Sequence, residues 1–153
     1  TINIDYQNIY TFCAVSPIRD MFVTASDAMI QKGDKEKAKA LLDRCLEVMP
    51  EKNFPYILPS MRSINDWSML SIFEDYLRIG ETQKAKDLAG KMADECIQSM
   101  LFFSTPTGPG ENDILSKKFA DSTAQIFFYM IHISEQHGAK DLASWLQEKM
   151  DNM

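Results

Sequence analysis

A short phrase that occurs twice constrains the fold of this chain more than any other feature. The first copy, GDKEKAKALL, runs from Gly33 to Leu42, and the second, GETQKAKDLA, runs from Gly80 to Ala89, 47 residues later. Each copy follows one segment with an apolar stripe and opens another. A glycine between two amphipathic segments is typical of a helical hairpin, and recurrence at a constant spacing is typical of a repeat protein. We therefore expect stacked helical hairpins, an architecture that commonly binds other proteins.

The apolar positions around the two glycines share one register. In the segments that follow the two glycines, apolar residues recur 47 positions apart. Adding 47 to Ala38, Leu41, Leu42 and Cys45 gives Ala85, Leu88, Ala89 and Met92. The same shift works on the first segments: Phe22, Ala25 and Met29 become Met69, Ile72 and Tyr76. Spacings of three and four place each set on one face of a helix. The two hairpins are therefore predicted to bury equivalent faces.

A third hairpin is predicted around Gly138, with a looser match. Ala143, Leu146 and Met150 correspond to Ala38, Leu41 and Cys45 at an offset of 105. Gln147 breaks this match with a polar residue. A polar outer face suits a terminal element that ends a stack. The last helix is therefore expected to cap the array.

The 153 residues suit one domain, which we divide at its breaker residues. Residues 1–15 lack a helical period and form a lead-in, and Ser16 with Pro17 predicts the first helix start. Ser63 and Asp66 resemble a capping box. The proline-containing connection after Pro50 and the loop Ser104–Gly110 separate the hairpins. The expected units are hairpin one over 16–50, hairpin two over 63–103 and hairpin three over 112–151.

Charge and hydrophobicity narrow the partner classes. A net charge of −6 disfavours nucleic acid, and it disfavours docking on an anionic membrane through a basic patch. No apolar run approaches the roughly 20 residues that cross a bilayer, so direct bilayer insertion by this region is not expected. Cys45 and Cys96 lie on apolar stripes and are predicted to be core residues.

Catalytic and metal-binding patterns are missing from the sequence. His132 and His137 are five residues apart and do not share a helix face, so we expect a partly buried His132 and an exposed His137 without a metal. Thr107–Gly110 lacks the lysine of a phosphate-binding loop, and no Gly-x-Ser-x-Gly elbow occurs. Adjacent acidic pairs such as Glu74 and Asp75 point in different directions on a helix. We therefore predict no catalytic residues, no cofactor and no metal.

A groove lined by the first helix of each hairpin is the candidate binding surface. The predicted groove residues are Asp20, Val23, Asp27, Ile30 and Gln31, then Trp67, Leu70, Glu74, Leu77 and Arg78, then Gln125, Phe128, His132 and Glu135. Trp67 suits a stacking or hot-spot role, but it could equally pack beneath the proline-containing connection. The segment Phe54–Pro59 could likewise form a docking surface or wrap its own core.

Hairpin one resembles the tetratricopeptide repeat. With Pro50 as the terminal proline, the signature positions are occupied by Phe22, Ala25, Ser26, Met29, Ala38, Leu42 and Cys45. Phe22 replaces the usual tryptophan and Met29 the usual tyrosine. The resemblance implies an all-α fold of antiparallel helical hairpins stacked as a right-handed superhelical array.

A second resemblance covers most of the chain, best from Arg19 to Ala89. The runs RDMF from Arg19, GDKEKA from Gly33, LDRCLEVMP from Leu42, FPY from Phe54 and YLRIGETQKA from Tyr76 are similar to the soluble C-terminal tail of certain bacterial multi-pass membrane proteins. The membrane part of those proteins resembles protein O-mannosyltransferases. The resemblance implies that this region lacks the catalytic membrane portion and lies in the periplasm.

These features predict a non-enzymatic protein-interaction or scaffolding domain appended to a membrane glycosyltransferase-like protein. The expected partner is a protein, a peptide or the membrane portion of its own full-length chain. A chain that starts at Thr1 is expected to be part of a longer protein. The alternative is a structural or self-association module of a freestanding soluble adaptor.

Overall fold

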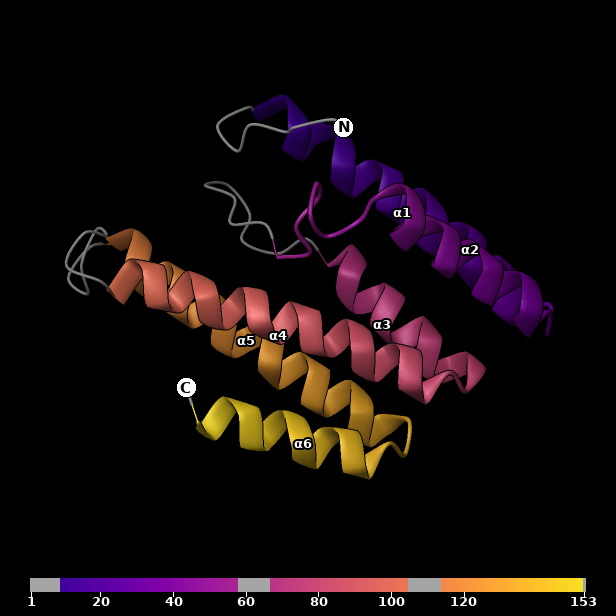
Figure 1. The fold of residues 1–153 in the computed structure, drawn as a ribbon. Coiled ribbons are helices and arrows are strands. Elements are labelled where there is room, and N and C mark those ends of the chain that lie inside the picture. The colour runs from indigo at the N-terminus through magenta and orange to yellow at the C-terminus, as the bar shows by residue number, and fades with distance from the viewer. Residues whose placement is uncertain (1–8, 58–66, 105–113, 153) are drawn as a thin grey trace.

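The computed structural model describes residues 9–57, 67–104 and 114–152 (Figure 1). Within these ranges the chain forms helices and no strand: α1 (Ile9–Gln31), α2 (Lys35–Val48), α3 (Ser68–Ile79), α4 (Thr82–Ser104), α5 (Ile114–Gln136) and α6 (Lys140–Asp151). The predicted all-α class is confirmed for the described part of the chain.

Three tight turns join the helices into pairs. Gly33, Gly80 and Gly138 have positive φ angles of 77°, 89° and 74°, a conformation that glycine adopts without strain. Asp34 then begins α2 by accepting a hydrogen bond from the Lys37 backbone N–H at 3.2 Å. The predicted glycine breaks at the three turns are confirmed.

The start of the first helix differs from the prediction. The helix start at Ser16 and the lead-in over residues 9–15 are wrong, because α1 begins at Ile9 and contains Pro17. The first eight residues of the predicted lead-in lie outside the described part of the chain. Proline in a helix interior removes one backbone hydrogen bond, which is why it usually marks a start. Here Val15 and Arg19 are buried on either side of the exposed Pro17, so packing holds the helix through the proline. The predicted capping box at Ser63 lies outside the described residues, and α3 begins at Ser68.

The hairpins pack in sequence order (Figure 1). Helix α3 contacts both α1 and α2, and α5 contacts both α3 and α4. The first helix of each new hairpin therefore lies against both helices of the hairpin before it. Helix α6 ends the series beside α5, at the opposite end from α1 and α2.

The core follows the internal register. Ala38 and Ala85, Leu42 and Ala89, and Cys45 and Met92 are register pairs, and all six residues are buried. Cys96 is buried as well, so the predicted core positions of the two cysteines on α2 and α4 are confirmed. Equivalent faces of the two hairpins thus contribute to one continuous core.

The connection after α2 is held down from two sides. Buried Arg19 donates hydrogen bonds to the carbonyls of Phe54 and Pro55 at 2.8 and 3.0 Å. The Glu95 carboxylate on α4 accepts hydrogen bonds from the backbone N–H groups of Tyr56 and Ile57 at 3.0 and 2.6 Å. Because Tyr56 is buried and Phe54 and Ile57 pack on the core, this part of the connection wraps its own core. Residues 58 and 59 lie outside the description.

Candidate functional site

The predicted groove residues fall into two groups in the structure. Leu70 and Leu77 on α3 are buried, and their register equivalents Val23 and Ile30 on α1 pack half-buried against the same core. These four apolar side chains stabilise the stack and are not open to a ligand. The sequence pattern could not separate them from surface positions, because a helix in a stack is covered on three sides.

The polar members of the predicted groove remain at the surface. Asp20, Gln31, Gln125, His132 and Glu135 are exposed, and Asp27, Glu74 and Arg78 are half-buried. They come from α1, α3 and α5, the first helices of the three hairpins, and α3 contacts both of the others. These polar side chains are therefore at least partly exposed on three helices that pack in series.

A polar network joins α1 to α3 beneath this surface. Arg78 forms ion pairs with Asp27 of α1 and with Asp75, the latter at 2.6 Å. Ser26 of α1 donates a hydrogen bond to the other Asp75 oxygen. Asp27 and Arg78 were predicted groove residues, whereas the buried Ser26–Asp75 contact was not predicted. This contact could have been predicted from the sequence, because Ser26 and Asp75 are polar residues at core-facing helix positions and a buried polar group needs a partner.

The Asp75 carboxyl has an unusual environment for an acid. Burial raises its pKa above the ordinary value, since an ionised carboxylate loses hydration there. The Ser26 hydrogen bond opposes this shift by stabilising the charged form. Arg78 opposes it as well, and its own pKa is raised, mainly by the hydrogen bond with Asp27. The network thus gives each Asp75 oxygen a partner and links the two helices.

A second polar contact joins α3 to the turn between α5 and α6. The His137 Nε2 atom lies 3.1 Å from the Glu74 carboxylate oxygen, a contact that crosses from the α5–α6 turn to α3. Together with the Arg78 network, it ties the first helices to one another through polar side chains. Two predicted groove residues, Glu74 and Arg78, therefore already have partners inside the chain.

An exposed aromatic cluster joins the N-terminal end of α3 to α5; it consists of Trp67, which precedes α3, and of Phe128, Tyr129 and His132. The Trp67 and Tyr129 rings meet edge to face with centroids 4.9 Å apart. Phe128 lies 6.0 Å from Tyr129 and stacks on His132 at 6.2 Å. The exposed fractions of the first three side chains are 43%, 63% and 38%. A contiguous group of half-exposed rings is a feature of binding surfaces.

Two sequence expectations change at this cluster. His132 is exposed and approaches Gln136 at 3.0 Å, so the prediction that it is partly buried is wrong. Its imidazole covers the face of Phe128 instead of entering the core. Tyr129 was not predicted, although it follows Gln125 by four residues and precedes His132 by three, which places it on the same helix face.

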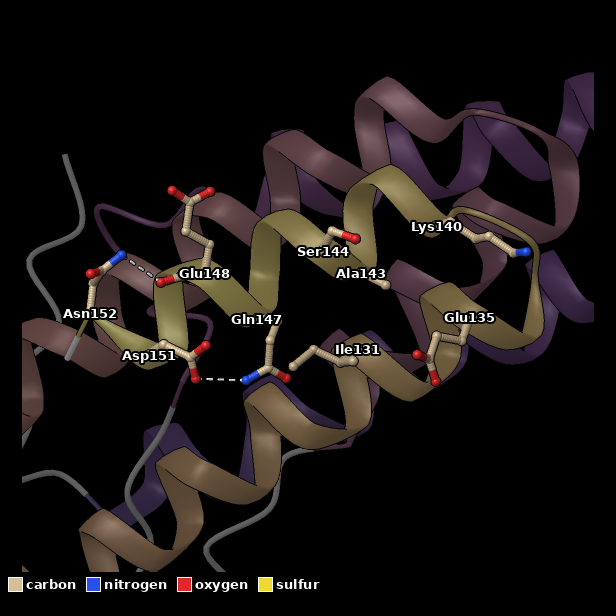
Figure 2. A pocket seen from close by; sticks show the side chains of 9 residues that line it. All are labelled: Ile131, Glu135, Lys140, Ala143, Ser144, Gln147, Glu148, Asp151 and Asn152. Atoms are coloured by element: carbon tan, nitrogen blue, oxygen red, sulfur yellow. Dashed lines mark hydrogen bonds between the residues drawn. The ribbon is translucent and has the colours of Figure 1, made fainter.

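Two surface hollows lie elsewhere on the molecule. The larger, about 820 Å³, lies at the surface where α5 and α6 meet and is lined mainly by polar residues (Figure 2). Gln147 faces this hollow and donates a hydrogen bond to Asp151 at 2.8 Å. Its register equivalents Leu42 and Ala89 are buried under the next hairpin. The predicted polar face of the last helix is therefore present in the structure.

The smaller hollow, about 500 Å³, lies between α2 and α4. The Tyr76 hydroxyl donates to Asp43 at 2.8 Å, and the Lys84 ammonium contacts the same carboxylate oxygen at 2.8 Å. Burial raises the pKa of the Tyr76 hydroxyl far above its usual range, so it stays protonated. Asp43 on α2 is therefore paired with Tyr76 on α3 and Lys84 on α4, and these contacts connect the two hairpins beside the hollow.

Within the described ranges, no three His, Cys, Asp or Glu side chains gather as they would around a metal ion. None of the described helices combines the length and apolar character needed to cross a membrane. Comparisons of the chain with protein-family models, with curated proteins and with solved structures find no match. Among the described residues, the aromatic cluster is the candidate binding surface.

Proposed function

We propose that this chain is a non-enzymatic interaction domain that holds a protein or peptide partner against the aromatic cluster. The observation that carries the proposal is the contact of Trp67, Phe128 and Tyr129 rings while each keeps more than a third of its surface open. Tryptophan and tyrosine dominate the binding energy of many protein interfaces. Rings already packed on one another also lose little conformational freedom when a partner binds.

The predicted polar groove residues lie on the first helices of the hairpins and suit the rim of an interface centred on the aromatic cluster. Asp20, Glu74 and Glu135 contribute negative charge on the first helices, and Asp27 largely balances Arg78. Interfaces commonly have such a polar rim around an apolar centre. The excess of carboxylates favours a partner segment with basic residues beside an apolar anchor.

The finer architecture that we propose is a tetratricopeptide-like right-handed superhelical array. The packing of α3 against α1 and α2, and of α5 against α3 and α4, supports this arrangement. The polar outer face of α6 supports the view that the array ends there. Such an array presents its first helices on one side, where the aromatic cluster lies.

We further propose that the domain is the periplasmic tail of a membrane glycosyltransferase-like protein. This proposal rests on the sequence resemblance between Arg19 and Ala89 to tails of that kind. The aromatic cluster would then grip the acceptor protein or brace the membrane portion of the same chain. An immunoblot of fractionated source cells tests the attachment: a band far above 17.5 kDa in the membrane fraction is expected, and a soluble band at 17.5 kDa would rule it out.

The binding role is tested with a displayed library of random peptides selected on the purified domain. We expect enriched peptides whose affinity falls by about 2 kcal/mol or more for Trp67→Ala, because a packed aromatic anchor is lost. The sequence contains two tryptophans, so a Trp145→Phe background makes emission report on Trp67 alone. A synthetic copy of an enriched peptide should then shift that emission on titration.

Val48→Ala is the matched control, since Val48 is an apolar residue of similar exposure on α2, away from the cluster. It should leave peptide affinity unchanged, and both variants should keep the unfolding midpoint of the parent. Selected peptides that bind Trp67→Ala as tightly as the parent would contradict the proposed surface.

A further inference from the structure

The outer edge of α1 carries an apolar stripe that is separate from the aromatic cluster. Ile18, Met21, Ala25 and Ala28 follow one another at spacings of three and four, which places them on one helix face. Ile18 and Met21 are 45% and 71% exposed, and Met21 is the most exposed large apolar side chain of the described residues. The two alanines beside them are partly buried.

The internal register shows what this face is built to contact. A shift of 47 takes Met21, Ala25 and Ala28 to Ser68, Ile72 and Asp75, all of which are buried on α3. Asp75 contacts Ser26 of α1, so this face of α3 packs on the preceding hairpin. The edge of α1 is therefore a second copy of a helix-packing face that continues the established hairpin interface, and no described hairpin covers it.

We propose that the occupant of this edge is a second copy of the chain, paired about a two-fold axis with the two α1 helices antiparallel. The stripe has its large side chains at one end, Ile18 and Met21, and its small ones at the other, Ala25 and Ala28. In an antiparallel pair centred opposite residue 23, Met21 of each copy lies over Ala25 of the other, and Ile18 lies over Ala28. A two-fold interface requires this kind of self-complementarity.

Charge also favours this pairing over a head-to-tail stack. From Ile18 to Ala28 the stripe contains no charged side chain, so two copies of an acidic molecule can meet there without like charges in contact. The opposite edge of the stack presents polar Gln147 and Asp151 on α6. An apolar edge would leave those polar groups without water, so continued stacking of α1 onto α6 is unfavourable.

Sedimentation equilibrium over a wide protein concentration range tests the pairing. One helix face is smaller than a standard interface, so we expect a reversible monomer–dimer equilibrium in place of a permanent dimer. Met21→Glu should weaken dimerisation about tenfold or more, because it buries a charge opposite Ala25 of the other copy. Ala25→Lys should do the same for the reciprocal reason.

The double variant Met21→Glu/Ala25→Lys makes the test specific for the proposed geometry. Antiparallel pairing brings each new glutamate against a new lysine of the other copy, so dimerisation should recover. Leu101→Glu is the control, because Leu101 is similarly exposed on α4 and should not affect association. Circular dichroism should show that all variants keep their helices, since Met21 and Leu101 are exposed and Ala25 is only partly buried.

Three outcomes would overturn the inference. The first is a monomer at every concentration, and the second is a dimer that Met21→Glu leaves intact. The third is a double variant that stays as weak as the single ones, which would exclude the antiparallel register. Because the aromatic cluster is elsewhere, peptide binding should be the same for Met21→Glu and the parent, so failure here is distinguishable from failure of the proposed function.

Discussion

At the scale of single residues, the buried network around Asp75 decides how α1 meets α3. A buried carboxylate is costly unless partners replace its hydration, and Asp75 has Ser26 on one oxygen and Arg78 on the other. Arg78 in turn is shared with Asp27. Such a joint specifies one alignment of the two helices, because a shift of either helix would separate the charges.

The raised pKa of Asp75 predicts a pH dependence with a defined sign. The folded state binds the Asp75 proton more tightly than the unfolded chain does, since burial raises the pKa above its ordinary value of 3.8. This contribution to stability is complete below pH 3.8 and is lost as the pH rises through the folded-state pKa. Asp27 and Arg78 are the charged groups that face the carboxyl, from α1 and α3.

Asp75→Asn removes this titration and so isolates it. Urea unfolding from acid to neutral pH should show that the free energy of unfolding of the parent falls relative to that of the variant as pH rises. A difference that grows in the opposite direction would mean that Ser26 and Arg78 outweigh burial. A Glu74→Gln variant is the control, because Glu74 is partly exposed and lies outside the Ser26–Asp75 contact.

At the scale of helices, the joints are set by local geometry. Each of the three turns contains a glycine with positive φ, and the chain reverses its direction there. Helix α1 shows the opposite case, in which tertiary contacts carry a helix through Pro17. Local signals are therefore decisive where the backbone conformation is special, and weaker where packing can offset their cost.

A glycine pair on neighbouring elements tests this difference. Gly80→Ala should lower the free energy of unfolding by about 1–2 kcal/mol, because a side chain is disfavoured in the left-handed region. Gly90→Ala should raise it by about 0.5–1 kcal/mol, because Gly90 lies inside α4 and alanine favours helix. The new methyl carbon would sit 3.6 Å from the Trp145 ring, an ordinary contact. Chemical denaturation of both variants provides the measurement. Equal effects of the two substitutions would contradict the view that Gly80 is required by its positive φ and Gly90 is not.

At the scale of the whole molecule, stability is distributed along a line of neighbours. Helix α3 contacts α1, α2, α4 and α5, whereas α6 packs chiefly on α5. In repeat-like stacks each unit is stabilised by its own core and by the interface with the next unit. Loss of packing at α3 should therefore destabilise the whole stack, whereas α6 should be able to unfold locally while the rest of the stack stays folded.

Two cavity-forming changes distinguish these roles. Leu146→Ala on α6 and Phe73→Ala on α3 each remove a fully buried side chain and should cost about 2–5 kcal/mol. Hydrogen exchange should accelerate mainly in α5 and α6 for Leu146→Ala, with α1 to α3 still protected. For Phe73→Ala it should accelerate throughout. Uniform acceleration in both variants would show that the domain unfolds as a single unit.

Much of the architecture was predictable because it depends on local pattern. The 47-residue register located the paired helices, the buried faces and the glycine turns, since periodicity directly specifies which side of a helix is apolar. The polar face at Gln147 was readable for the same reason. The start of α1 was not, because burial of Val15 and Arg19 outweighs a proline signal and neither contact is local.

The candidate site was only partly predictable. Asp27 and Arg78 were both predicted for the groove, and the structure brings them into an ion pair between α1 and α3. The contacts of Arg78 with Asp75 and of Glu74 with His137 were not predicted. Leu70 and Leu77 have the same helical spacing as surface residues and are buried only because α3 lies between other helices. The spacing of residues predicts which side chains share a face of one helix, but it does not show which other helices cover that face.

The sequence by itself determined the helical hairpins, their turns and the face that each helix buries, because these follow from hydrogen bonding and apolar periodicity within short stretches of chain. Only the tertiary structure decided which polar residues pair between helices, that Trp67 meets Tyr129 in an open cluster, and that Met21 stays uncovered at one edge. Those outcomes depend on the distances and angles between helices, which arise when the hairpins stack.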